Sequence, residues 1–283
     1  MKQKLDIKWY NSIDSTNLQA VRESDDAPDR RVWAAEFQTA GRGQRGNKWE
    51  GAKNKNLAFT ILLRPFMLSP SKQFLISEVS AIGVCNYLKG KGVDATIKWP
   101  NDIYVGDKKI CGMLIEHSLS GEGISYSISG IGINMNQRIF NSDAPNPTSL
   151  SLLRYPDILS LSASTEEEPL LFNLKVELEE VLHCLFDLYD RLSDKAQWSI
   201  IEREYLNLMY RREGYYFFKE LSLKGAAEPV TVGFYKESCN EFKHESNIIE
   251  ARIVGLDTNY NLILEQRNGT VHSYAFKEIK YLL

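Results

Sequence analysis

Several features that define other protein classes are missing from this chain. It has four cysteines, Cys85, Cys111, Cys184 and Cys239, and no two form a C-x-x-C pair. Such spacing disfavours a zinc site, and a chain of this length needs no disulfide scaffold. No apolar run approaches the roughly 18 residues of a membrane span, and residues 1–6 lack the apolar core of a signal peptide. These absences favour a cytoplasmic protein with reduced thiols and no membrane partner.

A strong net charge and several catalytic motifs are also absent. The formal net charge is −3, so no overall positive field favours nucleic acid, and we expect no nucleic-acid partner. The Walker loop G-x-x-x-x-G-K-[ST] and the G-x-S-x-G elbow do not occur, which disfavours a P-loop ATPase and an α/β-hydrolase. The histidines have no metal-ligand spacing. Any affinity for anions must therefore be local.

One basic, glycine-rich stretch has the composition of an anion-binding loop. It reads Gly41-Arg42-Gly43-Gln44-Arg45-Gly46-Asn47-Lys48-Trp49. Glycine lets backbone N–H groups approach a ligand closely, and arginine supplies planar donor forks for phosphate or carboxylate. Taken alone, the stretch fits a basic surface turn better. Its place in a long connection between two predicted strands favours a functional lid or a disordered segment.

Hydrophobic periodicity predicts an α+β fold with a mixed, largely antiparallel sheet. Strands are predicted over residues 7–13, 32–38, 57–65, 95–99, 103–105, 109–116 and 124–136. Helices are predicted over residues 18–23, 69–88, 166–192 and 196–209, with a loop over 145–165. Short strands over 215–218, 230–234, 248–254, 262–266 and 271–274 predict a small C-terminal barrel. The expected domains are residues 1–214 and 215–283.

Polar groups gather at the ends of these predicted elements. Asp14-Ser15-Thr16-Asn17 precedes a helix, where it either caps the helix or binds a polar ligand head. Lys98-Trp99-Pro100-Asn101-Asp102 ends a strand, and it fits a turn cap better than a water-mediated Mg²⁺ site. Lys109 opens an apolar strand, either as a strand-end lysine in water or as a cation in a covered site. Lys108 fits the solvated position better.

Three glycines are predicted to share one face of the sheet. Gly130 and Gly132 are two residues apart on a strand, so they face the same side, and Gly112 of the preceding strand is expected beside them. Glycine within a strand marks a bulge, tight packing or a close approach by another group. The pattern therefore leaves open a flat floor for a planar or bicyclic ligand and simple tight packing.

These motifs together resemble the biotin protein ligase family over roughly residues 7–136. The resemblance implies a class II synthetase-like catalytic domain over 1–214 and an SH3-like β-barrel over 215–283. It implies that biotin and ATP form biotinyl-5′-AMP, from which biotin passes to a lysine of a biotin carboxyl carrier protein. Mg²⁺ is expected with the ATP phosphates, with Asp102 as the one candidate side-chain ligand.

The resemblance also assigns site residues, with Lys109 and Arg42 as the catalytic pair. The implied biotin-binding residues are Ser15, Thr16, Asn17, Gln38, Gly41, Arg42, Gly112, Gly130 and Gly132. The implied ATP- and adenylate-binding residues are Arg42, Arg45, Lys48, Trp49, Lys98, Asn101, Asp102, Lys109 and Asn134.

Two other functions fit the same motifs less well. A lipoate protein ligase shares the fold and chemistry, but the G-R-G-x-R-G and K-W-P-N-D patterns favour biotin. A non-catalytic biotin-binding regulator would not need Lys109 and Arg42. Bifunctional family members carry an N-terminal helix-turn-helix domain, for which no room remains before Ser15, so we expect no operator binding. The resemblance leaves a homodimer open.

Gln44 is a departure from the family pattern that can be tested. Many relatives carry arginine there, so we expect this chain to lack one phosphate contact and to retain biotinyl-5′-AMP less tightly. Gln44→Arg should then release the intermediate more slowly than the wild type does. The measurement is the rate at which preformed biotinyl-5′-AMP leaves each protein, and equal rates would contradict the prediction.

Overall fold

The computed structural model describes residues 5–43, 48–121, 123–141, 146–157, 171–221 and 247–282. The chain forms two compact units, Met1–Tyr210 and Arg211–Leu283. The predicted α+β architecture is confirmed for the helix-covered mixed sheet and for the all-β C-terminal part. None of the described helices is long and apolar enough to cross a membrane.

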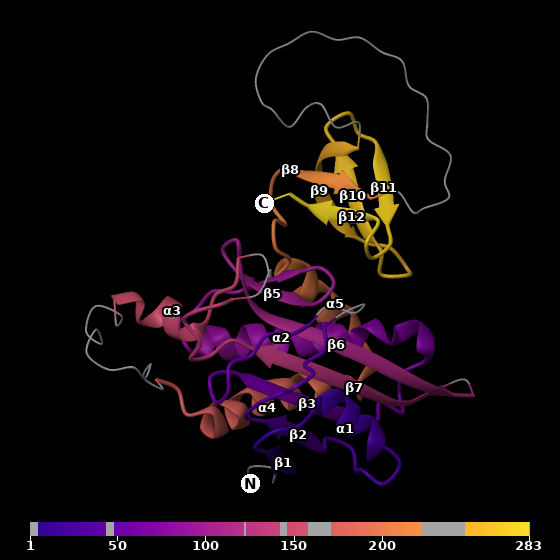
Figure 1. Ribbon diagram of the computed structural model, residues 1–283. Coiled ribbons are helices and arrows are strands. Elements are labelled where there is room, and N and C mark those ends of the chain that lie inside the picture. Colours follow the sequence, from indigo (N-terminus) through magenta and orange to yellow (C-terminus); the bar gives the residue numbers. More distant parts are fainter. Residues whose placement is uncertain are drawn as a thin grey trace. The chain divides into compact units, whose positions relative to one another are not determined.

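The first unit is built on a seven-stranded sheet with the order β1-β2-β3-β7-β6-β5-β4 (Figure 1). Its strands are β1 (Ile7–Tyr10), β2 (Val32–Ala35), β3 (Leu57–Leu63), β4 (Thr96–Lys98), β5 (Asp102–Val105), β6 (Lys108–Ser120) and β7 (Gly123–Ile133). β1 and β2 pair in parallel, and the other neighbours pair antiparallel. The long β6–β7 hairpin therefore lies in the interior of the sheet, between β3 and β5.

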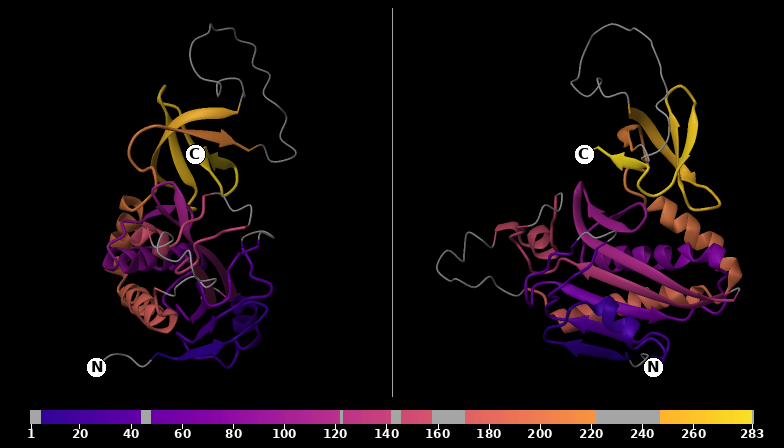
Figure 2. Two further views of the ribbon diagram at one scale, coloured as in Figure 1. Left: turned by 60° about the vertical axis from the view of Figure 1, so that its left-hand side comes forward. Right: turned by 45° about the vertical axis from the view of Figure 1, so that its right-hand side comes forward.

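Helices cover both faces of this sheet. They are α1 (Thr16–Arg22), α2 (Phe74–Gly90), α3 (Leu150–Arg154), α4 (Leu174–Arg191) and α5 (Trp198–Asn207), with short 3-10 turns at Pro70–Lys72 and Lys195–Gln197. Figure 2 shows α2, α4 and α5 gathered on one side of the sheet and α1 on the other. Ser129 of β7 contacts Ser80 of α2, with 3.1 Å between the hydroxyls, so its neighbour Gly130 faces α1.

Tight packing joins the two long helices behind the sheet. α2 is buried along most of its length. A Cβ added at Gly83 would lie 2.6 Å from Leu185 Cδ2, so only glycine lets α2 approach α4 this closely. This helical layer supports the central strands from behind and leaves their other face to α1.

The second unit is a five-stranded antiparallel sheet with the order β11-β10-β9-β8-β12. Its strands are β8 (Tyr216–Glu220), β9 (Ile248–Leu256), β10 (Leu262–Gln266), β11 (Val271–Tyr274) and β12 (Ile279–Tyr281). The predicted Asn268-Gly269 turn joins β10 to β11, and Gly269 has the positive φ of +84° that favours glycine. The sequence pattern did not predict β12, which has only three residues.

Several predicted boundaries differ from the structure. The predicted loop over 145–165 contains α3, whose cap residue Ser149 accepts from Leu152 N–H. The helix predicted from residue 166 begins at Leu174, because the Asn173 side chain caps it and ends the preceding extended segment. Residues 158–170 and the strand predicted over 230–234 lie outside the described residues.

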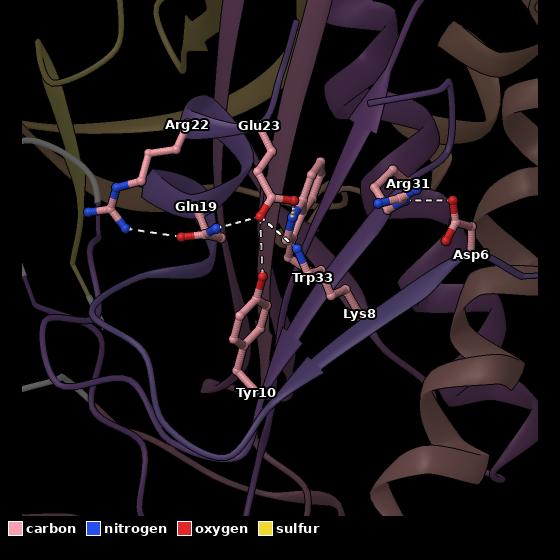
Figure 3. A network of polar contacts seen from close by, with 8 residues as sticks. All are labelled: Asp6, Lys8, Tyr10, Gln19, Arg22, Glu23, Arg31 and Trp33. Carbon is pink, nitrogen blue, oxygen red and sulfur yellow. Dashed lines mark hydrogen bonds and ion pairs between the residues drawn. The ribbon is translucent and has the colours of Figure 1, made fainter. Parts of the chain in front are cut away.

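A carboxylate fastens α1 to the edge of the sheet. Glu23, at the C-terminal end of α1, accepts from Lys8 Nζ at 2.8 Å, from Gln19 Nε2 at 2.6 Å and from the buried Trp33 Nε1 at 2.8 Å (Figure 3). Tyr10 OH adds a longer contact of 3.4 Å. The hydrogen bond from Lys8, helped by that from Trp33, lowers the pKa of Glu23 to about 2. Contacts from β1 and β2 thus converge on one helix end.

We predict that Glu23→Gln lowers the free energy of unfolding at pH 7 by about 1–2 kcal/mol, because charged hydrogen bonds become neutral. An unfolded glutamate titrates near pH 4.3, above the folded pKa of about 2. The carboxylate therefore stabilises the fold above pH ~4.3, and this contribution disappears as the pH falls towards 2. Denaturant unfolding of both proteins from pH 7 to pH 3 should show the difference shrinking.

Glu179→Gln, an exposed change on α4, is the matched control and should stay within about 0.5 kcal/mol of the wild type. A pH-independent difference for Glu23→Gln would contradict the assigned role of its charge.

Candidate active site

A small cleft opens on the α1 face of the sheet. Its lining combines the N-terminus of α1, the glycine-rich stretch and strands β3, β6 and β7. The lining residues are Ser15, Thr16, Asn17, Gln38, Arg42, Trp49, Phe59, Leu114, Gly130, Ile131 and Gly132. Seven of the residues that the sequence assigned to biotin are among them: Ser15, Thr16, Asn17, Gln38, Arg42, Gly130 and Gly132. Residues far apart in the chain thus meet around one space.

The two remaining residues assigned to biotin lie beside the cleft. Gly112 pairs directly with Gly132, and Leu114 pairs with Gly130, so the predicted alignment of glycines on one face is confirmed. Gly41 lies where the glycine-rich stretch begins. Sequence reasoning missed Phe59, Leu114 and Ile131, although Leu114 could have been found because it lies two residues after Gly112 on the same strand face.

The start of α1 is held by Gln38, which forms an isolated bridge with Ile13 just before the helix. Gln38 Oε1 accepts from Thr16 N–H at 2.8 Å and lies 3.1 Å from Thr16 Oγ1. Ser15 is the N-cap residue, but its side chain makes no capping hydrogen bond. Gln38, and not Ser15, thus caps the first N–H group of the helix, and ligand binding by this segment stays a prediction.

The glycine face carries protein side chains. A Cβ at Gly130 would lie 1.9 Å from Asn17 Oδ1, and a Cβ at Gly132 would lie 2.4 Å from Trp49 Cε2. A Cβ at Gly112 would lie 2.8 Å from Trp49 Cζ3. The glycines thus allow Asn17 and the indole to rest on the strands, which is the tight packing that the sequence left open. Trp49 Nε1 is buried there without a hydrogen-bond partner.

The two ends of the glycine-rich stretch close on each other. Trp49 N–H donates to Gly41 O at 3.0 Å, and Arg42 forms an antiparallel bridge with Lys48. A Cβ at Gly41 would lie 2.7 Å from Trp49 O, so this pairing requires glycine. Arg42 reaches the cleft, with its guanidinium 3.7 Å from Glu116 Oε1. Lys48 is exposed, and Arg45, predicted to bind phosphate, lies outside the described residues together with Gln44.

An irregularity in β6 brings Lys109 to the same face as Gly112. The β5–β6 register shifts between Ile103 and Tyr104, where one extra residue enters β6. A Cβ at Gly112 would consequently lie 3.2 Å from Lys109 Nζ. Lys109 Nζ is 2.7 Å from Asp102 Oδ1 and 6.0 Å from the Trp49 ring centre. The Lys109 side chain is therefore partly buried beside Gly112, whereas Lys108 is exposed.

Backbone pairing holds Lys109 in place. Its N–H donates to Asn146 O at 2.8 Å, and its carbonyl accepts from Thr148 N–H at 2.9 Å. Asn134, predicted to face ATP, donates through Nδ2 to Thr148 O at 2.9 Å and so attaches the same segment to the end of β7. Asn134 thus holds Thr148 and, through it, the backbone of Lys109. It is not one of the described residues that line the cleft.

The two charged ends of the Lys98–Asp102 segment contact different residues. Asp102 faces Lys109, and Asn101 is buried. Lys98 Nζ lies 3.1 Å from Tyr104 OH and 4.7 Å from the centre of that ring. Within the described ranges, no three His, Cys, Asp or Glu side chains cluster as metal ligands. Asp102 is thus a single carboxylate beside a cation, which does not by itself make a metal site.

The buried cysteines are poor nucleophiles. Burial raises the pKa of the Cys85 thiol to about 12 and raises that of Cys111 well above its usual value. Both thiols therefore remain protonated, although Cys111 directly precedes Gly112 at the cleft.

The amino-acid sequence is similar to those of known proteins. Residues 9–134 match the biotin/lipoate A/B protein ligase family. The bifunctional ligase/repressor BirA of Escherichia coli (strain K12) is 30% identical over 59% of this chain and 51% of that protein. A biotin–[acetyl-CoA-carboxylase] ligase from Paracoccus denitrificans is 32% identical over 43% of this chain and 51% of that protein. The chain therefore spans about half the length of these two curated relatives.

A solved structure extends the likeness to the whole fold. The biotin protein ligase from Aquifex aeolicus in complex with biotin and ATP superimposes with a TM-score of 0.69 at 21% identity. The match covers 98% of this chain and 99% of that one. Residues 9–134 are thus similar to the biotin/lipoate A/B protein ligase family, and the whole chain shares the fold of that solved biotin protein ligase.

Proposed function

We propose that this protein activates biotin with ATP and transfers it to a lysine of a biotin carboxyl carrier protein. The observation that carries the proposal is the position of Lys109, whose ammonium lies 2.7 Å from Asp102 and beside Gly112, the strand partner of the cleft residue Gly132. The names of the curated relatives support biotin as the substrate.

The first step joins two anions, so it needs positive charge at the point of contact. An oxygen of the biotin carboxylate attacks the α-phosphorus of ATP, the bond to the β-phosphate breaks, and pyrophosphate leaves. Lys109 offsets the charge of the carboxylate and the α-phosphate, while Asp102 holds the ammonium in place. Arg42, at the mouth of the cleft, binds phosphate through its guanidinium. Mg²⁺ enters as part of the ATP complex.

The ring of biotin occupies the polar end of the cleft. Thr16 and Gln38 provide fixed hydrogen-bonding groups there, because each holds the other in position. Gln38 Nε2 lies 3.4 Å from the Cβ position of Gly41, so its donors face the start of the glycine-rich stretch. A ligand bound between them is oriented with its chain towards Lys109.

The second step transfers biotin to the carrier. The ε-amine of the acceptor lysine attacks the carbonyl carbon of biotinyl-5′-AMP, the carbon–oxygen bond to AMP breaks, and the amine loses a proton. Trp49 and the paired ends of the glycine-rich stretch exclude water, which would otherwise hydrolyse the anhydride. No enzyme nucleophile is required for either step.

The direct experiment mixes the purified chain with biotin, ATP, Mg²⁺ and a biotin carboxyl carrier domain and follows the carrier mass. We expect the mass increase of one biotinyl group, dependent on the acceptor lysine. Biotin-dependent ATP–pyrophosphate exchange with lipoate as competitor separates the two substrate classes of the family. Preference for lipoate would replace biotin in the proposal, and binding of biotin without exchange would indicate a regulator.

Substitution of Lys109 tests the catalytic assignment. Lys109→Ala should lower kcat of biotin-dependent exchange at least ~100-fold, because the cation is lost where negative charge meets in the transition state. The exposed neighbour gives a matched control, and Lys108→Ala should leave exchange within about twofold, as is usual for solvated lysines. Circular dichroism melting should show that both variants fold. Unchanged exchange in folded Lys109→Ala would refute the assignment.

A further inference from the structure

A buried threonine that no sequence motif contains lies beneath the candidate biotin pocket. Thr60 of β3 pairs with Gly130 of β7 and is fully buried on the side facing α1. Its hydroxyl oxygen lies 2.8 Å from Thr16 Oγ1 and 2.7 Å from Asn17 Oδ1. Because Gly130 has no side chain, Thr60 contacts both residues at the start of α1.

The orientation of Asn17 determines where the Thr60 proton goes. Asn17 Nδ2 donates to Leu114 O at 3.2 Å and lies 3.4 Å from Glu116 Oε2, so both neighbours on that side are acceptors. The amide oxygen must then face Thr60, where it can only accept. Thr60 is the donor in both of its contacts, so its one hydroxyl proton is shared between Asn17 Oδ1 and Thr16 Oγ1.

The direction of the Thr16 hydroxyl follows from that of Thr60. Thr60 Oγ1 donates to Thr16 Oγ1 at 2.8 Å, so Thr16 directs its own proton elsewhere. Thr16 Oγ1 donates to Gln38 Oε1 at 3.1 Å, which also accepts the Thr16 backbone N–H. With its proton held by Gln38, the Thr16 oxygen has one lone pair left to accept from a ligand in the cleft.

We propose that Thr60 is a positioning residue that makes Thr16 an acceptor for a ring N–H of the substrate. This inference rests on the proposed function, because the ureido ring of biotin carries such N–H groups. A dithiolane ring, as in lipoate, has none and cannot use this acceptor. Thr60 would thus contribute to substrate selection without touching the substrate.

The test removes the hydroxyl and keeps the shape. Thr60→Val should raise the KM for biotin about fivefold to tenfold, the effect of one lost hydrogen bond, with kcat and the KM for ATP within about twofold. Thr60→Ser should restore the wild-type KM. In a Thr16→Val background, Thr60→Val should have no further effect, because Thr60 acts through Thr16. The assay is ATP–pyrophosphate exchange, with Thr60→Ala as a second variant should valine prevent folding.

A buried hydroxyl on the opposite face provides the control. Ser80→Ala removes the contact with Ser129 and should leave the KM for biotin unchanged. The inference is overturned by an unchanged KM in Thr60→Val, by parallel changes in kcat and both KM values, or by failure of Thr60→Ser to restore binding. A wild-type protein without biotin-dependent exchange would overturn the proposed function itself, which is a separate result.

Discussion

The contact between Asn17 and Gly130 is the constraint on which the candidate site depends. The Asn17 amide occupies the space that a side chain at position 130 would fill, since a Cβ there would lie 1.9 Å from its oxygen. Any larger residue would displace the Asn17 amide from β7 and with it the contacts that Asn17 makes with Thr60 and Leu114. Glu23 holds the other end of the same helix against β1 and β2, so both ends of α1 are fastened to the sheet.

A local irregularity in β6 decides which of two neighbouring lysines lies beside Gly112. In a regular strand, Lys109 and Gly112 would face opposite sides, because their separation is odd. The extra residue in β6 reverses the side of Lys109 and pairs its ammonium with Asp102. The neighbouring Lys108 remains in solvent, which explains how two adjacent lysines of equal chemistry acquire different roles.

Much of the fold was predictable from local pattern. Alternation and apolar runs indicated the strands of the first unit, and the β-rich tail indicated a second unit of different class. The elements that were missed are short: α3 and β12 contain five and three residues, too few for a periodic signal. The true start of α4 depends on a side-chain cap at Asn173, and a long polar segment before it hid that boundary.

The sequence by itself determined the chemistry of the site: its cations, its small polar side chains and its three glycines, in an order that resembles one family. Tertiary structure decided what those residues touch. Asn17 and Trp49 pack against the glycines, and Asn134 donates to the backbone of Thr148. Thr60 contacts Thr16, although it belongs to no sequence motif. The physical reason is that hydrogen-bond partners and close approaches are set by strand register and helix docking, which bring together residues far apart in the chain.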